Sequence, residues 1–184
     1  MTTIDTTVRV WAADPLRLDA IRSGARDEQG NPLRSFLAER DGGEPLRCCL
    51  RWARRGESIA LISWAPFGAP SPWREVGPVF VHTHRCAGPA TTADLPGDLR
   101  TGPLVLRPYS PDGAMIYAHI TIVPDGQDAA PAIATLCASP AVSVVHVRTL
   151  APQCFLYAAT AAAQNRTGSP SAASTAIAAN STQR

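Results

Sequence analysis

The sequence predicts an α+β fold, a mainly antiparallel β-sheet with a few short helices in a single domain. Residues 46–157 contain seven short segments whose patterns are typical of strands. Short turns join most of these segments, and strands joined in this way pair antiparallel. Hydrophobic residues make up 45% of the 184 residues, which is enough for one sizeable core.

The N-terminal part of the chain predicts one strand and two helices. Residues Thr7–Trp11 alternate in polarity and indicate a first strand. Asp14 followed by Pro15 is typical of a helix N-cap with proline at the first helical position, and this helix ends near Gly24. A second short helix is predicted over Leu33–Arg40, because glycines follow it directly.

The middle of the chain supplies the strands of the predicted sheet. The segments are Arg47–Ala53, Ser58–Trp64, Pro78–Arg85, Leu104–Tyr109, Ala114–Val123, Val142–Arg148 and Cys154–Tyr157. The sequence Ser-Pro-Asp-Gly at Ser110–Gly113 favours a tight turn, which predicts a hairpin there. A helix over Gln127–Ala138 would turn Ile133, Leu136 and Cys137 towards the sheet.

Residues 158–184 differ in composition from the rest of the chain. They are rich in alanine, serine and threonine, and Ile177 is their one large aliphatic residue. Such a segment buries too little apolar surface to offset its chain entropy, so we expect a disordered tail. A helical start over Ala158–Gln164 is left open. The predicted domain therefore covers residues 1–157.

Composition excludes several classes of function. The 17 basic residues are all arginine, so neither a Schiff-base lysine nor the lysine of a phosphate-binding loop is present. A net charge of +2 gives no footprint for a nucleic acid, and no apolar run is long enough to span a membrane. The five cysteines are odd in number and no export signal precedes them, so we expect a reduced protein in the cytoplasm.

Three predicted strands each carry two functional side chains at positions i and i+2, which lie on the same face of a strand. The pairs are His82 and His84, Arg107 and Tyr109, and His146 and Arg148. If these faces converge, they form a cationic pocket rich in hydrogen-bond donors. A solvated sheet face and a structural polar network are the alternatives.

A converged pocket would suit acid–base chemistry on an anion. Arg107 and Arg148 could bind a carboxylate or a phosphate through paired N–H groups. His146 or His82 could act as the general acid or base, and Tyr109 could donate to a developing oxyanion. Three aromatic residues of a proline-rich loop could wall the pocket or cover the sheet edge. They are Trp64, Phe67 and Trp73.

Metal binding and thiol chemistry are further hypotheses. His82, His84 and Cys86 alternate on one predicted strand and could supply two or three ligands to a transition metal such as zinc. The expected fourth ligand is Cys49, Cys154 or His146. A cysteine nucleophile, Cys86 or Cys154, could instead pair with a histidine. Burial as simple apolar thiols is the alternative for all the cysteines.

These observations favour a small-molecule enzyme of the isomerase, lyase or cyclase type that needs no organic cofactor. Its substrate would be an anionic or polarised small molecule, and no nucleic acid or membrane is expected as a partner. The sequence leaves the oligomeric state open, and a homo-oligomer is one alternative. The alternatives are a non-catalytic module that binds an anionic metabolite or a partner, and a metal-dependent enzyme that uses His82 and His84.

Short motifs spread over residues 40–157 also have a characteristic order. They are Arg47–Arg51, Gly56–Glu57, Ser63–Phe67, Pro72–His82, Leu106–Tyr109, Asp112–Gly113, Met115, Val145–Arg148 and Cys154–Phe155. Their order and spacing resemble the bacterial domain of unknown function 1203. The resemblance implies a small soluble bacterial protein, and it implies a shared site at Arg107, His146, Arg148 and Cys154.

The chain departs from the pattern of that family at a few positions. Members often carry cysteine where Leu46 stands, so the resemblance gives no support to a C-x-x-C metal or redox motif here. They often carry tyrosine where Trp64 and Trp73 stand, and the larger rings would suit a bulkier, flatter ligand. The alanine-rich tail lies outside the family pattern.

Overall fold

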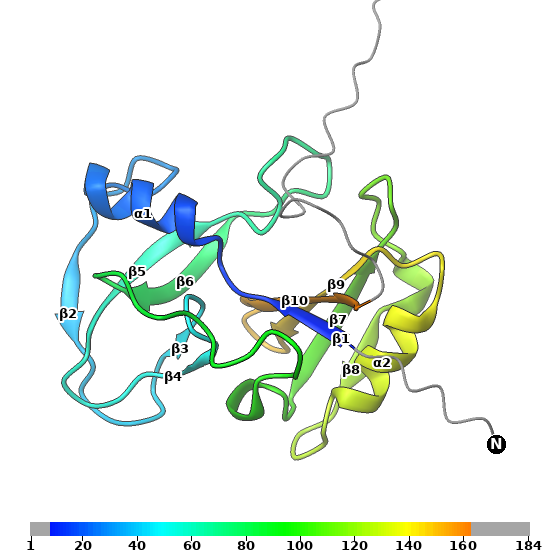
Figure 1. Ribbon diagram of the computed structural model, residues 1–184. Helices are drawn as coiled ribbons and strands as arrows, with labels where there is room; N and C mark the ends of the chain where they lie inside the picture. The colour runs from blue at the N-terminus through cyan, green and yellow to red at the C-terminus, as the bar shows by residue number, and fades with distance from the viewer. Residues whose placement is uncertain (1–7, 163–184) are drawn as a thin grey trace, which may run out of the picture.

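The computed structural model describes residues 8–162, which form two five-stranded sheets and two α-helices (Figure 1). One sheet has the strand order β1-β10-β9-β7-β8 and the other has the order β2-β5-β6-β3-β4. All neighbouring strands pair antiparallel except β3 and β6, which pair in parallel. The predicted α+β class with mainly antiparallel strands is therefore confirmed.

The first sheet collects strands from both ends of the described chain. Its members are β1 (Val8–Trp11), β7 (Leu104–Tyr109), β8 (Thr121–Val123), β9 (Val144–Thr149) and β10 (Phe155–Ala161). Helix α2 (Ala130–Ala138) packs against it and buries Ile133, Leu136 and Cys137, as its sequence predicts. Two short 3-10 helices lie in the connections, η1 (Gly97–Leu99) and η2 (Tyr117–His119).

The second sheet is formed from a continuous part of the chain. Its members are β2 (Ser35–Leu37), β3 (Pro45–Leu46), β4 (Arg51–Trp52), β5 (Ser58–Trp64) and β6 (Gly77–His82). Helix α1 (Pro15–Gly24) lies beside this sheet, and Leu18 and Ile21 enter the core. Asp14 is its N-cap, as predicted, because its Oδ1 accepts a hydrogen bond from Leu16 N at 2.8 Å.

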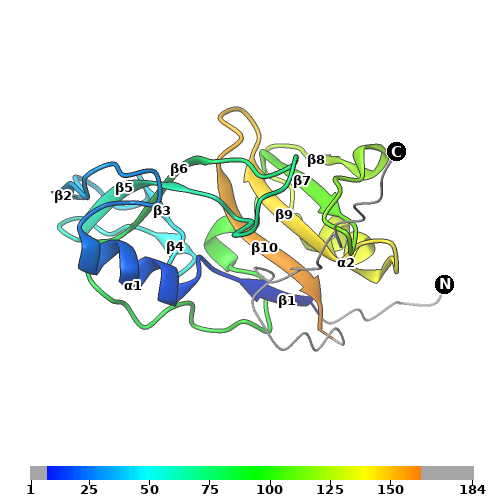
Figure 2. The same ribbon diagram turned by 90° about the horizontal axis from the view of Figure 1, so that it is seen from above.

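The two sheets share a hydrophobic core and form one domain. One buried cluster joins Ile59 and Val81 of the second sheet to Tyr109 and Phe155 of the first. Figure 2 shows the two sheets side by side, with the connection from β5 to β6 reaching from the second sheet towards the first. Among residues 8–162, neither helix combines the length and the apolar character that crossing a membrane requires.

The helix predicted over Leu33–Arg40 is wrong, because this segment contains strand β2. Ser35–Leu37 pairs antiparallel with the start of β5, where Leu37 lies opposite Ser58. The leucine is 63% exposed, so a helical apolar face would have had no core to cover. Backbone pairing at the sheet edge decided the structure of this segment.

Two predicted strands around the cysteines are too long. Arg47–Ala53 is not one strand, because residues 47–50 form a turn between β3 and β4. The strand predicted over Pro78–Arg85 ends at His82, so alternation along a strand does not extend to His84. These two boundaries matter for function, because they fix the positions of His82 and of the two adjacent cysteines, Cys48 and Cys49.

Two further boundaries also differ from the prediction. The turn at Ser110–Gly113 is confirmed, with Gly113 N donating to Ser110 O at 2.9 Å. Of the predicted second hairpin strand, Thr121–Val123 forms β8 and Met115 forms an isolated bridge to Tyr109. Strand β10 runs to Ala161, so a helical start at Ala158 is wrong, and residues 158–161 extend the first sheet. Of the tail predicted over residues 158–184, residues 163–184 lie outside the described residues.

Candidate functional site

Two adjacent cysteines lie in the turn at residues 47–50. Leu50 N donates to Leu46 O at 2.8 Å, which closes one helix-like turn of the chain. Successive side chains in such a turn point about 100° apart, whereas they point to opposite faces in a strand. Cys48 and Cys49 can therefore both approach the same neighbour.

That neighbour is His82, at the end of β6. Its Nδ1 atom lies 3.4 Å from the Sγ atom of Cys48 and 3.9 Å from that of Cys49. Cys86 follows in the next loop, and the four ligand atoms of Cys48, Cys49, His82 and Cys86 all lie within 4.8 Å of one another. We call these four residues the thiol–imidazole cluster; three are buried and Cys86 is half-buried.

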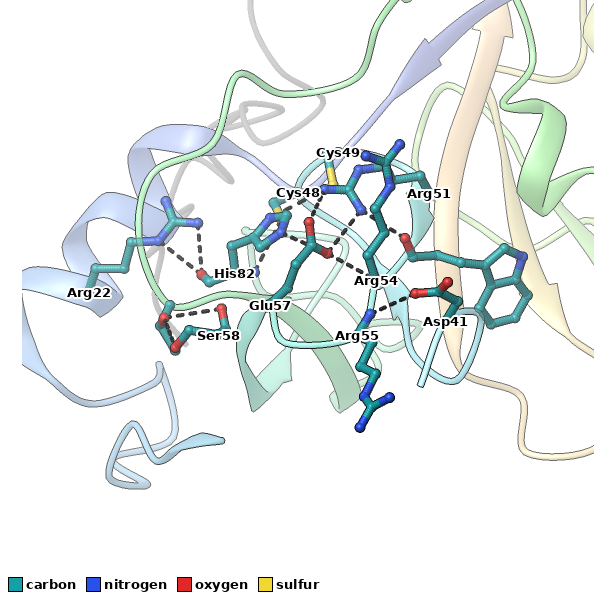
Figure 3. A network of polar contacts seen from close by, with 12 residues as sticks. Arg22, Asp41, Cys48, Cys49, Arg51, Arg54, Arg55, Glu57, Ser58 and His82 are labelled. Carbon is teal, nitrogen blue, oxygen red and sulfur yellow. Dashed lines mark hydrogen bonds and ion pairs between the residues drawn. The ribbon is translucent and has the colours of Figure 1, made fainter. Parts of the chain in front are cut away.

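The far side of the His82 ring faces a carboxylate. Its Nε2 atom lies 3.5 Å from Oε2 of Glu57, and Arg51 holds that carboxylate with contacts of 2.6 and 3.0 Å (Figure 3). The Nε2–H group of His82 can therefore donate to Glu57 while Nδ1 faces the sulfur atoms. A carboxylate in this position is the usual outer partner of a metal-ligating histidine.

The cluster shifts the pKa values of its members. The hydrogen bond with Cys48 raises the pKa of His82 to about 9, although burial acts in the opposite direction. The hydrogen bond with Cys48 also lowers the pKa of the Cys49 thiol, whereas the same partner and burial raise the pKa of Cys86 to about 12. On the outer side, the Arg51 hydrogen bond lowers the pKa of Glu57 to about 2. Positive charge is thus favoured at the centre of the cluster.

A hollow of about 420 Å³ opens beside the cluster. Cys48 and Cys86 line it together with residues of α1, among them Leu18 and Arg22. Arg22 is fixed there, because its guanidinium donates to the carbonyl oxygen of His82 at 3.2 Å. Arg85 lies at the rim with a side chain that is 76% exposed. Asp19 pairs with both arginines, at 3.0 Å from Arg22 and 3.7 Å from Arg85, so the hollow combines two sulfur atoms with two partly neutralised positive charges.

Two of the three predicted polar pairs meet on the first sheet. Arg107 of β7 lies directly opposite His146 of β9, and Arg148 lies opposite Val105 two positions along. The ring of Tyr109 is 4.7 Å from that of His146. We call Arg107, Tyr109, His146 and Arg148 the polar face. His82 and His84 do not join it, because His82 belongs to the other sheet.

The arginines of the polar face are already paired with a carboxylate. Glu75 accepts from Arg107 at 2.7 and 2.8 Å and from Arg148 at 2.6 Å. Arg107 also donates to the side-chain oxygen of Gln153 at 2.7 Å, and Arg148 donates to the backbone oxygen of Gln153 at 2.8 Å. An external anion would have to compete with Glu75 for this site.

His146 is enclosed by aromatic rings. It is 2% exposed, and the rings of Phe67, Tyr109 and Phe155 lie 4.6, 4.7 and 5.2 Å from its own ring. Burial, together with the nearby positive charge of Arg148, lowers the pKa of His146 well below its usual value, so the ring is neutral at neutral pH. The ring can accept a proton only where this aromatic cover opens.

The other predicted site residues lie around these two centres. His84 is exposed, and its ring is 5.6 Å from that of His82, but it is not part of the thiol–imidazole cluster. Cys154 and the buried Trp64 line a second hollow of about 220 Å³ beside Arg148 and Glu75. Trp73 is half-buried, and its Nε1–H group donates to Tyr117 at 3.3 Å.

Sequence reasoning missed three residues of these sites. Cys48 is not among the ligands predicted from the sequence, because a strand over Arg47–Ala53 would point its side chain to the face opposite Cys49. Glu57 and Glu75 lie outside the strands that carry the predicted pairs, and only the folded chain brings them to His82 and to the arginines. The Gly-Glu motif at residues 56–57 was visible in the sequence, but its spacing did not indicate a histidine partner.

The fold and these two centres define an α+β protein with a buried thiol–imidazole cluster in one sheet and an arginine-rich polar face in the other. A family model described as "Protein of unknown function (DUF1203)" matches residues 43–160, which includes every member of both centres. The chain belongs to this family. Neither a curated protein nor a solved structure matches the chain.

Proposed function

We propose that the protein binds a transition-metal ion, zinc, in the thiol–imidazole cluster. The observation that carries this proposal is the approach of four ligand atoms, three sulfur and one nitrogen, to within 4.8 Å of one another. Zinc binds cysteine sulfur at about 2.3 Å and histidine nitrogen at about 2.0–2.1 Å in tetrahedral sites. The ligand atoms of such a site are then about 3.5–3.8 Å apart, so a small contraction completes the geometry.

The donor set and its surroundings support zinc over harder metals. Thiolate ligands select soft or borderline ions, whereas calcium and magnesium take oxygen ligands. Glu57 orients His82 through Nε2 and leaves Nδ1 free to coordinate. The backbone N–H group of His82 also donates to Cys48 Sγ at 3.3 Å, which holds this sulfur atom beside the imidazole.

The first role of the bound metal would be structural, because it would stabilise the wall of the hollow. Four protein ligands close a tetrahedral site, and a closed site stabilises the fold. The metal would join the 47–50 turn, the end of β6 and the loop that carries Cys86. It would also fix Cys48 and Cys86 in the wall of the 420 Å³ hollow, where Arg22 and Arg85 can attract a small anion.

Chemistry at the metal requires an open coordination position. Cys86 is best placed to yield one, since it is the least buried of the four ligands and lines the hollow. An anionic small molecule in the hollow could then reach the metal, which would polarise it as a Lewis acid. The protein would then be a metal-dependent enzyme that acts on an anion.

The acid–base hypothesis for His146 stays a prediction. The neutral ring and the neighbouring arginines support it, because a neutral imidazole can take a proton from a substrate bound to them. The aromatic enclosure of His146 makes it the second candidate, since a substrate must first displace Phe67.

Elemental analysis of the full chain tests the metal proposal. Protein purified without chelators under reducing conditions should contain close to one equivalent of zinc. Cys49→Ser and Cys86→Ser should each lower this content several-fold, because they remove a ligand. Cobalt(II) in place of zinc should give the thiolate charge-transfer absorption of a tetrahedral site.

Two matched controls separate the cluster from its neighbours. Cys154→Ser removes a half-buried cysteine outside the cluster, and His84→Ala removes the neighbouring histidine. Both should keep the full zinc content. Wild-type protein with less than about a tenth of an equivalent, even after incubation with zinc chloride, would exclude the site.

A further inference from the structure

The connection between β5 and β6 covers the polar face of the other sheet. Residues 65–76, which we call the lid, leave the second sheet after Trp64 and return to it at Gly77. Between these points Phe67 lies against Tyr109 at 4.8 Å and Glu75 pairs with both arginines. The lid thus fills the space above the polar face with one aromatic ring and one carboxylate.

Side chains alone hold the lid to the first sheet. Within the described residues its one backbone–backbone hydrogen bond is internal, from Arg74 N to Ser71 O at 3.0 Å. Phe67 and Glu75 contact the first sheet, and Trp73 donates a hydrogen bond to Tyr117 of η2, in the connection between β7 and β8. A segment without ladder hydrogen bonds can open at low cost in free energy.

The polar face beneath the lid has unused hydrogen-bonding capacity. Three of its buried atoms, Tyr109 Oη, His146 Nδ1 and Arg148 Nε, find no hydrogen-bond partner among residues 8–162. The three residues are 0%, 2% and 6% exposed. Buried polar atoms without partners are costly and rare, and they mark places where a polar ligand is expected.

We propose that the polar face is the binding site of a small aromatic carboxylate and that the lid occupies this site when the ligand is absent. The carboxylate of the ligand would replace that of Glu75 between Arg107 and Arg148. Its ring would replace Phe67 against Tyr109 and His146. A hydroxyl group on the ring would satisfy the hydrogen-bonding atoms that the lid leaves unpaired.

The chemistry of the lid itself identifies this class of ligand. Two guanidinium groups facing one carboxylate form a recognition site for an oxyanion. The neutral imidazole and the phenol ring of Tyr109 provide an apolar slot for a flat ring. The 220 Å³ hollow beside Arg148, lined by Trp64 and Cys154, gives the displaced Glu75 or a larger ligand space to move into. This inference does not depend on the metal proposal.

Isothermal titration calorimetry with benzoate and 4-hydroxybenzoate tests the proposal. Glu75→Gln keeps the size of the side chain but removes the competing charge, so it should bind both compounds at least tenfold more tightly than wild type. Benzyl alcohol, which has the ring without the carboxylate, should bind to neither protein. Asp128→Asn, at the exposed ion pair with Arg100, should bind benzoate as wild type does.

Phe67→Ala is the second variant and opens the ring slot, so it should also bind benzoate more tightly. If Glu75→Gln lacks the circular dichroism spectrum of the wild type, the benzoate affinity of Phe67→Ala alone tests the proposal. Unchanged benzoate affinity in the folded variants would overturn the proposal. So would acetate or phosphate binding to Glu75→Gln as tightly as benzoate, because the site would then recognise charge without the ring.

Discussion

Leu50 adopts a left-handed backbone conformation, with φ of 57°, directly after the two adjacent cysteines. A non-glycine residue pays about 1–2 kcal/mol for this conformation. Its side chain is 4% exposed, so core packing offsets part of that cost. Backbone strain of this kind is concentrated at functional sites, and here it ends the turn that presents Cys48 and Cys49 to His82.

Asp27 is a second residue with a large local effect. Its carboxylate accepts hydrogen bonds from the backbone N–H groups of Gln29 and Asn31, each at 2.9 Å, and of Ser63 at 2.8 Å. Burial acts to raise its pKa, but the hydrogen bonds from Asn31 and Ser63 outweigh burial and lower the pKa below 3.8. The ionised carboxylate therefore fixes the loop after α1 to strand β5.

The lowered pKa gives a pH-dependent contribution to stability. Because the folded pKa lies below the unfolded value, the contribution is complete above 3.8 and is lost as the pH falls through the folded pKa. Asp27→Asn should lower the free energy of unfolding by about 1–3 kcal/mol at pH 7. In urea denaturation, this difference from wild type should shrink below about pH 4. A difference that stays constant down to pH 2 would contradict this role, and exposed Asp94→Asn provides the control.

At the scale of the element, helix α1 forms one wall of the 420 Å³ hollow. Pro15, Leu18 and Arg22 all line it, so the position of the helix start sets the position of its wall. Asp14 Oδ1 accepts from Leu16 N at 2.8 Å and from Arg17 N at 3.4 Å. These bonds satisfy N–H groups that have no partner within the helix.

Removal of this N-cap should lower the free energy of unfolding. Asp14→Ala should lower the free energy of unfolding by about 1 kcal/mol, whereas Asp14→Ser should keep most of the stability because serine also caps helices. Chemical denaturation at pH 7 measures both variants. Equal loss in the two variants would show that the charge of Asp14, and not its capping hydrogen bond, stabilises α1.

At the scale of the whole molecule, Arg47 ties the two sheets together. It is 2% exposed, and its Nε–H group donates to the carbonyl oxygen of Phe155 in β10 at 2.6 Å. Its backbone N–H group donates to the carbonyl oxygen of Phe80 in β6. Its carbonyl oxygen accepts from the N–H group of Ala13, in the segment between β1 and α1. Burial lowers the pKa of its guanidinium to about 10, which still leaves it charged at neutral pH.

The shared core and this link predict one cooperative unfolding transition. Tryptophan fluorescence and far-ultraviolet circular dichroism should give coincident urea curves for the wild type. Arg47→Met should keep a single transition but lower the free energy of unfolding by about 1.5–3 kcal/mol, because the carbonyl of Phe155 loses a charged donor. Arg54→Met, at an exposed position, should change it by less than about 0.5 kcal/mol. Separate transitions for the two probes would show that the sheets unfold independently.

Local spacing in the sequence determined several of the elements and much of the polar face. The Asp-Pro start of α1, the turn at Ser110–Gly113 and the buried side of α2 depend on residues a few positions apart. Strand alternation likewise put Arg107 and Tyr109 on one face, and His146 and Arg148 on one face. The register of β7 with β9 then joined them.

Only the tertiary structure decided which groups meet across the chain. Cys48 and His82 are 34 positions apart, and Glu75 reaches Arg107 over 32 positions, each through a loop or turn without a periodic pattern. Strand periodicity specifies the face on which a side chain lies, but loop packing specifies which distant side chain it contacts. The cluster of Cys48, Cys49, His82 and Cys86 therefore forms only when β3 pairs with β6 in the second sheet. The carboxylate of Glu75 covers the arginines only when the lid packs on the first sheet.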